Sequence, residues 1–310
     1  MVCDIDLFEN LQFRELLYPK KVMRICSFLP AATQALYRLG LENQVVGITF
    51  ECPGDKPRVV RSRLEDQSLS ASDIDETVAS AKKSGQSLYY IDESLLATLA
   101  PDIIFTQDVC TVCQIDTHLV RQVAKNLPRP PKIVPLLPKR LTDVWANIRT
   151  IAQTSGVPNQ GEELLASIYD RIDRVQQSWM GRSDQLRIVS FLEWPEPLFN
   201  CGHWIPDMIE LAGGYDPLAN PGGYSHRITF SDVQAQDPEI IVVAGCGLTV
   251  EQARKEMWSL SQKKGWTDLR AVRNEAVHVL PGDWFTCPGP GLVDGIERLA
   301  SIFHSAPDYE

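Results

Sequence analysis

Short apolar runs alternate with amphipathic helical segments twice along this chain, and this alternation constrains the fold more than any other feature of the sequence. In the first half, β-branched and apolar runs bounded by turn residues predict strands at 22–29, 44–49, 101–107 and 132–137. Amphipathic segments at 31–39, 91–99 and 118–127 lie between them. This order predicts a parallel sheet with covering helices, because parallel strands need helical crossovers.

The second half repeats the pattern after a helical section. Strands are expected at 186–193, 239–245 and 276–280. Apolar residues from Leu141 to Trp179 recur at helical spacing with one interruption, at Gly156-Val157-Pro158, and the few glycines and serines favour a stiff connection. We therefore predict an α/β protein of two Rossmann-like lobes with parallel sheets, joined by a long interlobe helix. The expected division is an extension at 1–21, lobes at 22–138 and 184–310, and the helical section at 139–183.

Two helix ends in the second half are marked by local patterns. Ser231 lies three residues before Gln234 and is a candidate capping residue for a helix that ends before Pro238. Pro288 and Pro290 are expected in the first turn of the last helix, where a missing N–H group costs nothing.

Composition restricts the class of protein. With 310 residues, of which 44% are hydrophobic and 23% charged, the chain can form two lobes that each bury a core. The formal net charge is −10, and the only approach to a basic patch is Arg58, Arg61 and Arg63, so no nucleic-acid partner is expected. No stretch nears the roughly 18 apolar residues of a membrane-spanning helix, so no membrane insertion is expected. Residues 1–21 lack a signal-peptide pattern, which predicts a cytoplasmic protein as the sequence stands and a periplasmic one if the N-terminus is incomplete.

Several stretches together resemble a known family. The opening strand, helix and second strand at 27–40 and 46–49, the strand entry at 99–104, its repeat at 237–243, and Asp283-Trp284-Phe285 after the last strand are similar to class III substrate-binding proteins. These proteins serve cobalamin, haem and siderophore importers, and the cobalamin-binding member of ABC importers is the most similar. The resemblance covers the chain from about residue 22 to the end.

The resemblance implies a bilobed fold with a rigid interlobe helix and a corrinoid, or another metal chelate, held between the lobes. It also implies docking to the permease of an ABC importer through one acidic residue on each lobe. In the second lobe Glu210 stands at the matching position. In the first lobe Ser94 stands there, and Glu93 just before it is the acidic candidate.

Six of the eight cysteines fall in loops that follow predicted strands: Cys52, Cys110, Cys113, Cys201, Cys246 and Cys287. In open α/β sheets the loops past the carboxyl ends of the strands form the ligand crevice, so these thiols are expected on the two walls of one cleft. In the cytosol they would be reduced. They then either bind zinc or iron, act as a redox pair, or pack as inert thiols. A candidate metal set is Cys52, Cys110, Cys113, His203 and Cys246.

Aromatic and polar residues in the same loops are candidate ligand contacts. Trp194, Trp204 and Trp284 are placed around one predicted cavity, where large rings give an apolar ligand broad contact. His203 is either an axial ligand for cobalt or iron or a hydrogen-bonded loop histidine. The other candidates are Glu51, Cys52, Arg63, Gln107, Asp108, Glu193 and Phe285; the arginines between 58 and 63 are interpreted as a polar, solvated loop.

The chain carries no hydrolase, zinc-protease or phosphate-loop motif, so it is not expected to be an enzyme. Gly289, Gly291 and Gly295 resemble a dinucleotide fingerprint but stand at the last helix rather than at the first strand-to-helix turn. The leading hypothesis is a binding protein for a corrinoid or a related metal chelate. The alternative is a cytosolic, thiolate-rich metal-binding or redox protein that reuses this fold, and a third possibility is an enzyme acting on a corrinoid.

Overall fold

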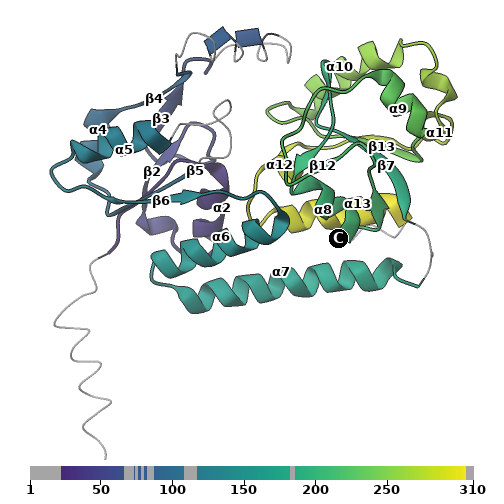
Figure 1. The fold of residues 1–310 in the computed structure, drawn as a ribbon. Helices are drawn as coiled ribbons and strands as arrows, with labels where there is room; N and C mark the ends of the chain where they lie inside the picture. The colour runs from purple at the N-terminus through teal and green to yellow at the C-terminus, as the bar shows by residue number, and fades with distance from the viewer. Residues whose placement is uncertain are drawn as a thin grey trace, which may run out of the picture.

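Two α/β lobes lie side by side above a long helix in the computed structural model (Figure 1), which describes residues 22–65, 73, 76–77, 80–81, 87–107, 117–181 and 186–304. The N-terminal lobe is at the left of Figure 1 and the C-terminal lobe at the right, and helix α7 (Pro158–Trp179) runs beneath both. Each lobe has its own mostly parallel sheet, which confirms the predicted fold class. No described helix is long and apolar enough to span a bilayer.

The N-terminal sheet has six strands in the order β4-β3-β2-β1-β5-β6, all parallel to their neighbours except β4, which runs antiparallel to β3. The central strands are apolar and fully buried because helices cover both faces of the sheet. The strands are β1 (Ile25–Ser27), β2 (Val45–Thr49), β3 (Arg58–Ser62), β4 (Tyr89–Ile91), β5 (Ile103–Gln107) and β6 (Lys132–Leu136). The helices are α2 (Pro30–Arg38), η1 (Glu42–Gln44), α4 (Glu93–Leu99) and α5 (Thr117–Lys125).

Strands β3 and β4 correct the sequence interpretation. The arginine-rich stretch, expected as a solvated loop, forms β3, in which Val59 and Val60 are buried while Arg58 stays exposed. Two buried valines and pairing with β2 outweigh the charges, because the arginine heads reach water from the strand's ends. Residue 91, expected at the start of a helix, ends β4; helix α4 begins later because Asp92 caps it, accepting the Leu95 N–H at 2.8 Å.

The predicted helical section consists of two helices, α6 (Leu141–Thr154) and α7, which break where the sequence indicated. Gly156 adopts φ +78° after α6, and Pro158 opens α7. One part of α6, including Val144 and Ile148, belongs to the core cluster of the C-terminal lobe. Ile151, one turn further on, belongs to a core cluster of the N-terminal lobe. A single helix therefore contributes to both cores, which makes the connection stiff.

The C-terminal sheet has four parallel strands in the order β11-β7-β13-β14. They are β7 (Arg187–Leu192), β11 (Gly214–Tyr215), β13 (Ile240–Val243) and β14 (Val277–Val279). A hairpin of β8 (Trp194–Pro195) and β9 (Leu198–Phe199) and a pair of β10 (Gly202–His203) and β12 (Asn220–Pro221) extend the lobe. The helices are α8 (Ile205–Leu211), α9 (Phe230–Gln236), α10 (Val250–Ser261), η2 (Trp266–Asp268), α11 (Arg270–Arg273), α12 (Asp283–Thr286) and α13 (Leu292–His304).

Two predicted helix ends are displaced. Helix α9 is capped by Thr229 rather than Ser231. Thr229 Oγ1 accepts a hydrogen bond from the Asp232 N–H at 3.2 Å, and the Asp232 carboxylate accepts one from the Thr229 N–H at 2.7 Å. The helix begins earlier than expected, at Phe230, whose ring packs on Trp266. Helix α13 begins at Leu292, so the prolines before it lie outside the helix.

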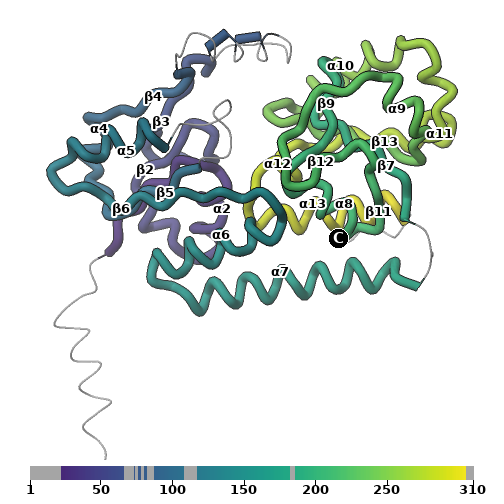
Figure 2. The backbone as a smooth tube through the Cα atoms, viewed as in Figure 1, coloured from purple at the N-terminus to yellow at the C-terminus, as the bar shows by residue number. Residues whose placement is uncertain are grey.

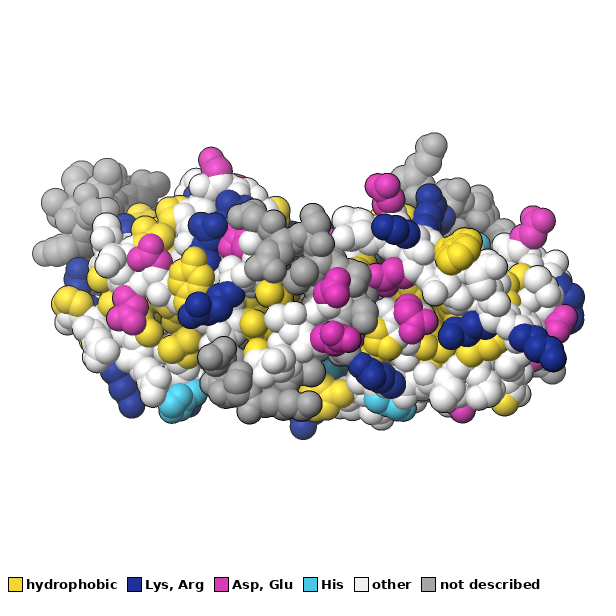
Figure 3. All heavy atoms as spheres, turned by 90° about the horizontal axis from the view of Figure 1, so that it is seen from above, with side chains coloured by type: hydrophobic (Ala, Val, Ile, Leu, Met, Phe, Trp, Pro, Cys, Tyr) yellow, Lys and Arg dark blue, Asp and Glu magenta, His cyan; other side chains and the backbone are white. Residues whose placement is uncertain are grey.

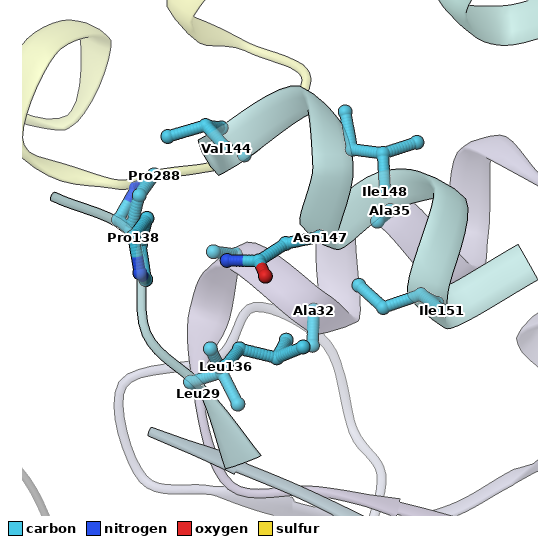
Figure 4. A pocket seen from close by; sticks show the side chains of 12 residues that line it. Leu29, Ala32, Ala35, Leu136, Pro138, Val144, Asn147, Ile148, Ile151 and Pro288 are labelled. Carbon is cyan, nitrogen blue, oxygen red and sulfur yellow. The ribbon is translucent and has the colours of Figure 1, made fainter. Parts of the chain in front are cut away.

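The lobes contact each other through two neighbouring loops, which we call the crossing segments. One leads from β6 of the N-terminal lobe to α6, and the other, between α12 and α13, extends from the C-terminal lobe onto the N-terminal lobe (Figure 2). Pro138 of the first crossing and Pro288 of the second lie beside each other and line one small pocket (Figure 4). The lobes therefore meet at a seam made of α2, α6 and these two crossing segments.

Candidate functional site

The loop after β2 and helix α12 bring the two lobes together. Cys287, just after α12, packs against the N-terminal core cluster that contains Cys52. Glu51 interacts electrostatically with Asp283 across the same junction. Viewed from above, acidic side chains gather where the lobes meet (Figure 3). We call Glu51, Cys52, Asp283, Trp284 and Cys287 the interlobe site.

The environment of Glu51 disfavours the charged form of its carboxyl group. The residue is exposed to solvent, but the protein around its carboxyl group excludes part of the water. This desolvation, and then the repulsion from Asp283, raises the pKa of Glu51 to about 7. Near neutral pH the interlobe site can therefore present a carboxylic acid as well as a carboxylate.

Trp284 of the interlobe site and Trp194 of the same lobe are both partly accessible to solvent. Trp284 in α12 is 38% exposed. Trp194 is half-buried, donates from Nε1 to the Cys246 carbonyl at 3.0 Å, and lies edge-on to Phe199. Cys246 in turn interacts electrostatically with Cys287 of the interlobe site. These two rings are suited to an apolar, planar ligand.

Two other predicted aromatic contacts belong to the core of the C-terminal lobe, which corrects the sequence interpretation. Trp204 is 5% exposed, and its Nε1 donates to the Phe285 carbonyl at 2.7 Å. Phe285 is fully buried and packs edge-on against Phe191. Trp204 follows β10 directly into α8, so its ring turns inward onto α12 instead of toward a ligand.

His203 is placed differently from a metal ligand. It has a left-handed φ of +53°, and its ring lies between those of Trp204 and Tyr224, 5.3 and 5.1 Å away. Its buried Nδ1 has no hydrogen-bond partner among the described residues, whereas metal-ligating histidines normally donate that second N–H. Burial lowers the pKa of His203, so the ring is neutral. This geometry favours a packed loop histidine over an axial ligand.

Glu193 connects, through hydrogen bonds, the loops on either side of His203. Its Oε1 accepts the Gly202 N–H at 3.1 Å, and its carboxyl group also bonds the Ser225 side chain. Gly202 is required here, because a Cβ would lie 2.5 Å from the Ser225 nitrogen. Burial raises the pKa of Glu193 to about 7. Glu193 therefore positions this wall of the lobe.

The cysteines do not form the predicted cage in the part of the chain that the structure describes. Cys201 is fully buried in the C-terminal core, so it is not a cleft thiol; it donates weakly to Asp216 at 3.7 Å. Cys52 is 2% exposed and lies 3.0 Å from Thr33 Oγ1. Within the described ranges, no three His, Cys, Asp or Glu residues are grouped so as to hold a metal. Cys110, Cys113 and Asp108 lie outside the described residues.

Burial also makes these thiols chemically inert. It raises the pKa of Cys52 to about 11 and that of Cys26 to about 12, and that of Cys201 well above its usual value. We expect a thiol reagent at pH 8 to leave Cys26, Cys52 and Cys201 unmodified in the native protein and to modify them after unfolding. Mass mapping of the modified peptides checks this, and rapid native modification of Cys201 would contradict it.

The remaining predicted residues are dispersed. Gln107 ends β5, is 6% exposed, and its Oε1 has no partner among the described residues. Arg63 is exposed just after β3, where its backbone N–H donates to the Leu88 carbonyl. Glu93 at the start of α4 and Glu210 near the end of α8 are both exposed, one on each lobe. Their role in docking stays a prediction.

Sequence reasoning missed Asp207 and Asp283. Asp207 in α8 accepts the Leu141 N–H at 2.8 Å and binds the Arg140 guanidinium, so the C-terminal lobe caps the interlobe helix α6. No local pattern could indicate this, because the partners are 66 residues apart. Asp283 directly precedes Trp284, which was a predicted ligand contact, so its position in the sequence could have suggested it.

Comparison with known proteins agrees with this architecture. Residues 93–284, more than half of the chain, match the family model described as periplasmic binding protein. The chain belongs to the periplasmic binding protein family. The match begins at α4 and ends at Trp284, so it spans the interlobe helices and most of the C-terminal lobe.

Individual members of the periplasmic binding protein family match nearly the whole chain. A vitamin B12-binding protein of Vibrio cholerae serotype O1 is 22% identical over 288 residues, 93% of this chain and 91% of that protein. The structure of the periplasmic vitamin B12 binding protein of Vibrio cholerae superposes with a TM-score of 0.64 at 20% identity, covering 90% of this chain and 96% of that one. A periplasmic heme-binding protein of Roseiflexus sp. RS-1 gives 0.66 at 18% identity, covering 91% and 98%.

Proposed function

We propose that this periplasmic binding protein holds a corrinoid, a cobalamin-like metal chelate, between its lobes and delivers it to the permease of an ABC importer. The observation that carries the proposal is Trp284, a large ring left 38% exposed where the lobes meet. The nearly full-length likeness to a vitamin B12-binding protein supports the choice of ligand.

The chemistry of the interlobe site suits such a ligand. A corrin ring is broad and apolar and carries amide side chains, so a tryptophan face can stack on it with little loss of side-chain entropy. Carboxyl oxygens of Glu51 and Asp283 can accept hydrogen bonds from ligand amides. The corrinoid brings its own metal, so no protein thiolate is needed for it, in agreement with the buried state of Cys52 and Cys201.

Replacing Trp284 by alanine is expected to weaken cobalamin binding about tenfold, since about 1.4 kcal/mol of stacking and apolar contact is lost. Titration calorimetry with cobalamin measures this. The matched control is Trp258→Ala, because Trp258 is 68% exposed on α10 and is not part of the interlobe site. A wild-type protein that neither retains cobalamin nor gains thermal stability with it would contradict the proposal, and retention of haemin instead would reassign the ligand.

The docking partner follows from the same proposal. The exposed carboxylates Glu93 and Glu210 lie on different lobes and would meet positively charged groups of a permease. Arg140 does not neutralise Glu210 directly, because the guanidinium of Arg140 donates its hydrogen bonds to Asp207.

A further inference from the structure

The segment from Pro288 to Gly291, the crossing segment between α12 and α13, connects two helices of the C-terminal lobe and contacts the N-terminal lobe. Pro288, Gly289 and Pro290 are buried. A Cβ at Gly289 would lie 3.2 Å from both the Cα and the carbonyl oxygen of Ala31 in α2. Such a distance is tighter than ordinary packing, so the crossing segment rests directly on the backbone of α2. A Cβ at this position requires the neighbouring backbone of α2 to move by a few tenths of an ångström, and a larger side chain requires more.

The contact continues along one stripe of α2. Ala31, Gln34 and Arg38 recur at helical spacing and face the crossing segment: Gln34 Oε1 lies 3.3 Å from a Gly289 Cβ position, and Arg38 pairs with Asp294 at 3.5 Å. Asp294 also binds Arg171 of α7 at 2.6 Å. The Arg38–Asp294 pair contributes little to stability, because both side chains are over 40% exposed and water screens their charges. The close backbone contact at Gly289 is therefore the stronger constraint.

The seam is not completely filled. A small pocket lies beside this contact, lined by apolar side chains of α2 and α6 and by Pro138 and Pro288, with the amide of Asn147 among them (Figure 4). Space at the seam means that a bulkier residue can be accommodated by a shift of one lobe, without unfolding either core.

A shift at Gly289 would reach the interlobe site. Gly289 follows α12, the helix that carries Trp284, after only Cys287 and Pro288, and the Gly289 N–H closes a tight turn on the Cys287 carbonyl at 2.7 Å. Prolines on both sides of Gly289 restrict the backbone further. The segment is short and stiff, so it transmits displacement instead of absorbing it.

We propose that Gly289 is a positioning residue for ligand binding: by letting the crossing segment rest on α2, it sets the separation of the lobes and hence the width of the interlobe site. Gly289, the first of the three glycines that resemble a misplaced dinucleotide fingerprint in the sequence, thus acts between the lobes. Only the link to the ligand rests on the proposed function; the effect on lobe separation does not.

The test compares Gly289→Val with Gly291→Val. Gly291 is a matched control, because a Cβ there would meet only the movable side-chain ends of Gln34 and Asp294, at 3.4 and 4.0 Å. Spin labels on non-canonical residues at Tyr90 and Trp258, both exposed and on different lobes, report the interlobe distance by pulsed electron resonance. We expect Gly289→Val to move the distance distribution outside that of the wild type and Gly291→Val to leave it in place.

Equal distributions for Gly289→Val and the wild type, with the fold intact by circular dichroism, would overturn the proposal. If the valine variant does not fold, Gly289→Ala replaces it and a smaller displacement in the same direction is expected. Cobalamin affinity is measured in parallel, and about tenfold weakening is expected only for the Gly289 variant. A displaced lobe in a protein that never binds cobalamin would leave lobe positioning standing and refute the proposed ligand.

Discussion

Replacing Trp204 by alanine is expected to lower the free energy of unfolding by about 3–5 kcal/mol, the largest effect among the variants considered. The indole is 5% exposed and sits in the core that contains Phe285 and Ile205. The alanine would leave a cavity and also free the Phe285 carbonyl, which accepts the indole N–H at 2.7 Å. Chemical denaturation at constant pH measures the loss.

Two further variants separate the causes. Trp204→Phe keeps most of the ring volume and removes the N–H donor, so a loss of about 1–3 kcal/mol is expected from the unpaired carbonyl and the smaller ring. Trp258→Ala is the control for the residue type, because its ring is 68% exposed and its removal should change stability by no more than about 0.5 kcal/mol. Equal losses for Trp204→Ala and Trp258→Ala would show that Trp204 is not a core residue.

The second large effect is a fall in stability as the pH rises from about 4.5 to about 7, caused by Glu193. Its pKa is raised in the folded protein by burial, so between these values the folded state holds a proton that the unfolded state has released. The stabilisation is fully present below the unfolded pKa and is lost as the pH passes the folded pKa. The contribution is about 3 kcal/mol from this carboxyl group. Two other carboxyl groups add in the same direction: Asp216, whose pKa burial raises to about 6, and the more exposed Glu51, whose pKa is raised to about 7.

Glu193→Gln is expected to flatten this pH dependence, because the amide oxygen can still accept the Gly202 N–H while no charge develops. The variant should be about as stable as the wild type at pH 5 and more stable at pH 8. Glu196→Gln, three residues further along and exposed, is the matched control. Denaturant midpoints measured from pH 5 to pH 8 test this prediction. The assignment would be refuted if the stability of the wild type rose over this range and that of Glu193→Gln rose in parallel.

Much of the fold could be predicted from periodicity. The buried strand β13 is a continuous apolar run and β5 begins with one, and α6 and α7 show clean helical spacing with a Gly-Val-Pro break. Strand β3 could not be predicted in this way, because its two valines are flanked by arginines and only strand pairing decides their conformation. Its strand conformation depends on pairing with β2 on one side and β4 on the other, and local sequence does not report such pairing.

The site was less predictable because residue type does not fix direction. Trp204 and Trp284 both follow a strand at a loop, yet Trp204 is in the core and Trp284 is partly exposed. Cys201 and Cys287 also look alike in sequence, yet one is sealed in the C-terminal core and the other packs on the opposite lobe. The turn that precedes each side chain sets its direction, and no composition rule reports it.

By itself the sequence determined the class of fold, since alternating strand and helix periods allow few arrangements other than parallel sheets with covering helices, and a stiff helical section between two such halves requires two lobes. Only the tertiary structure decided which loop residues face each other. Glu51 meets Asp283, Asp207 caps α6, and Gly289 rests on α2 because distant segments are brought together by packing of the cores. Local propensity carries no information about such contacts, because their energy exists only once both lobes have folded.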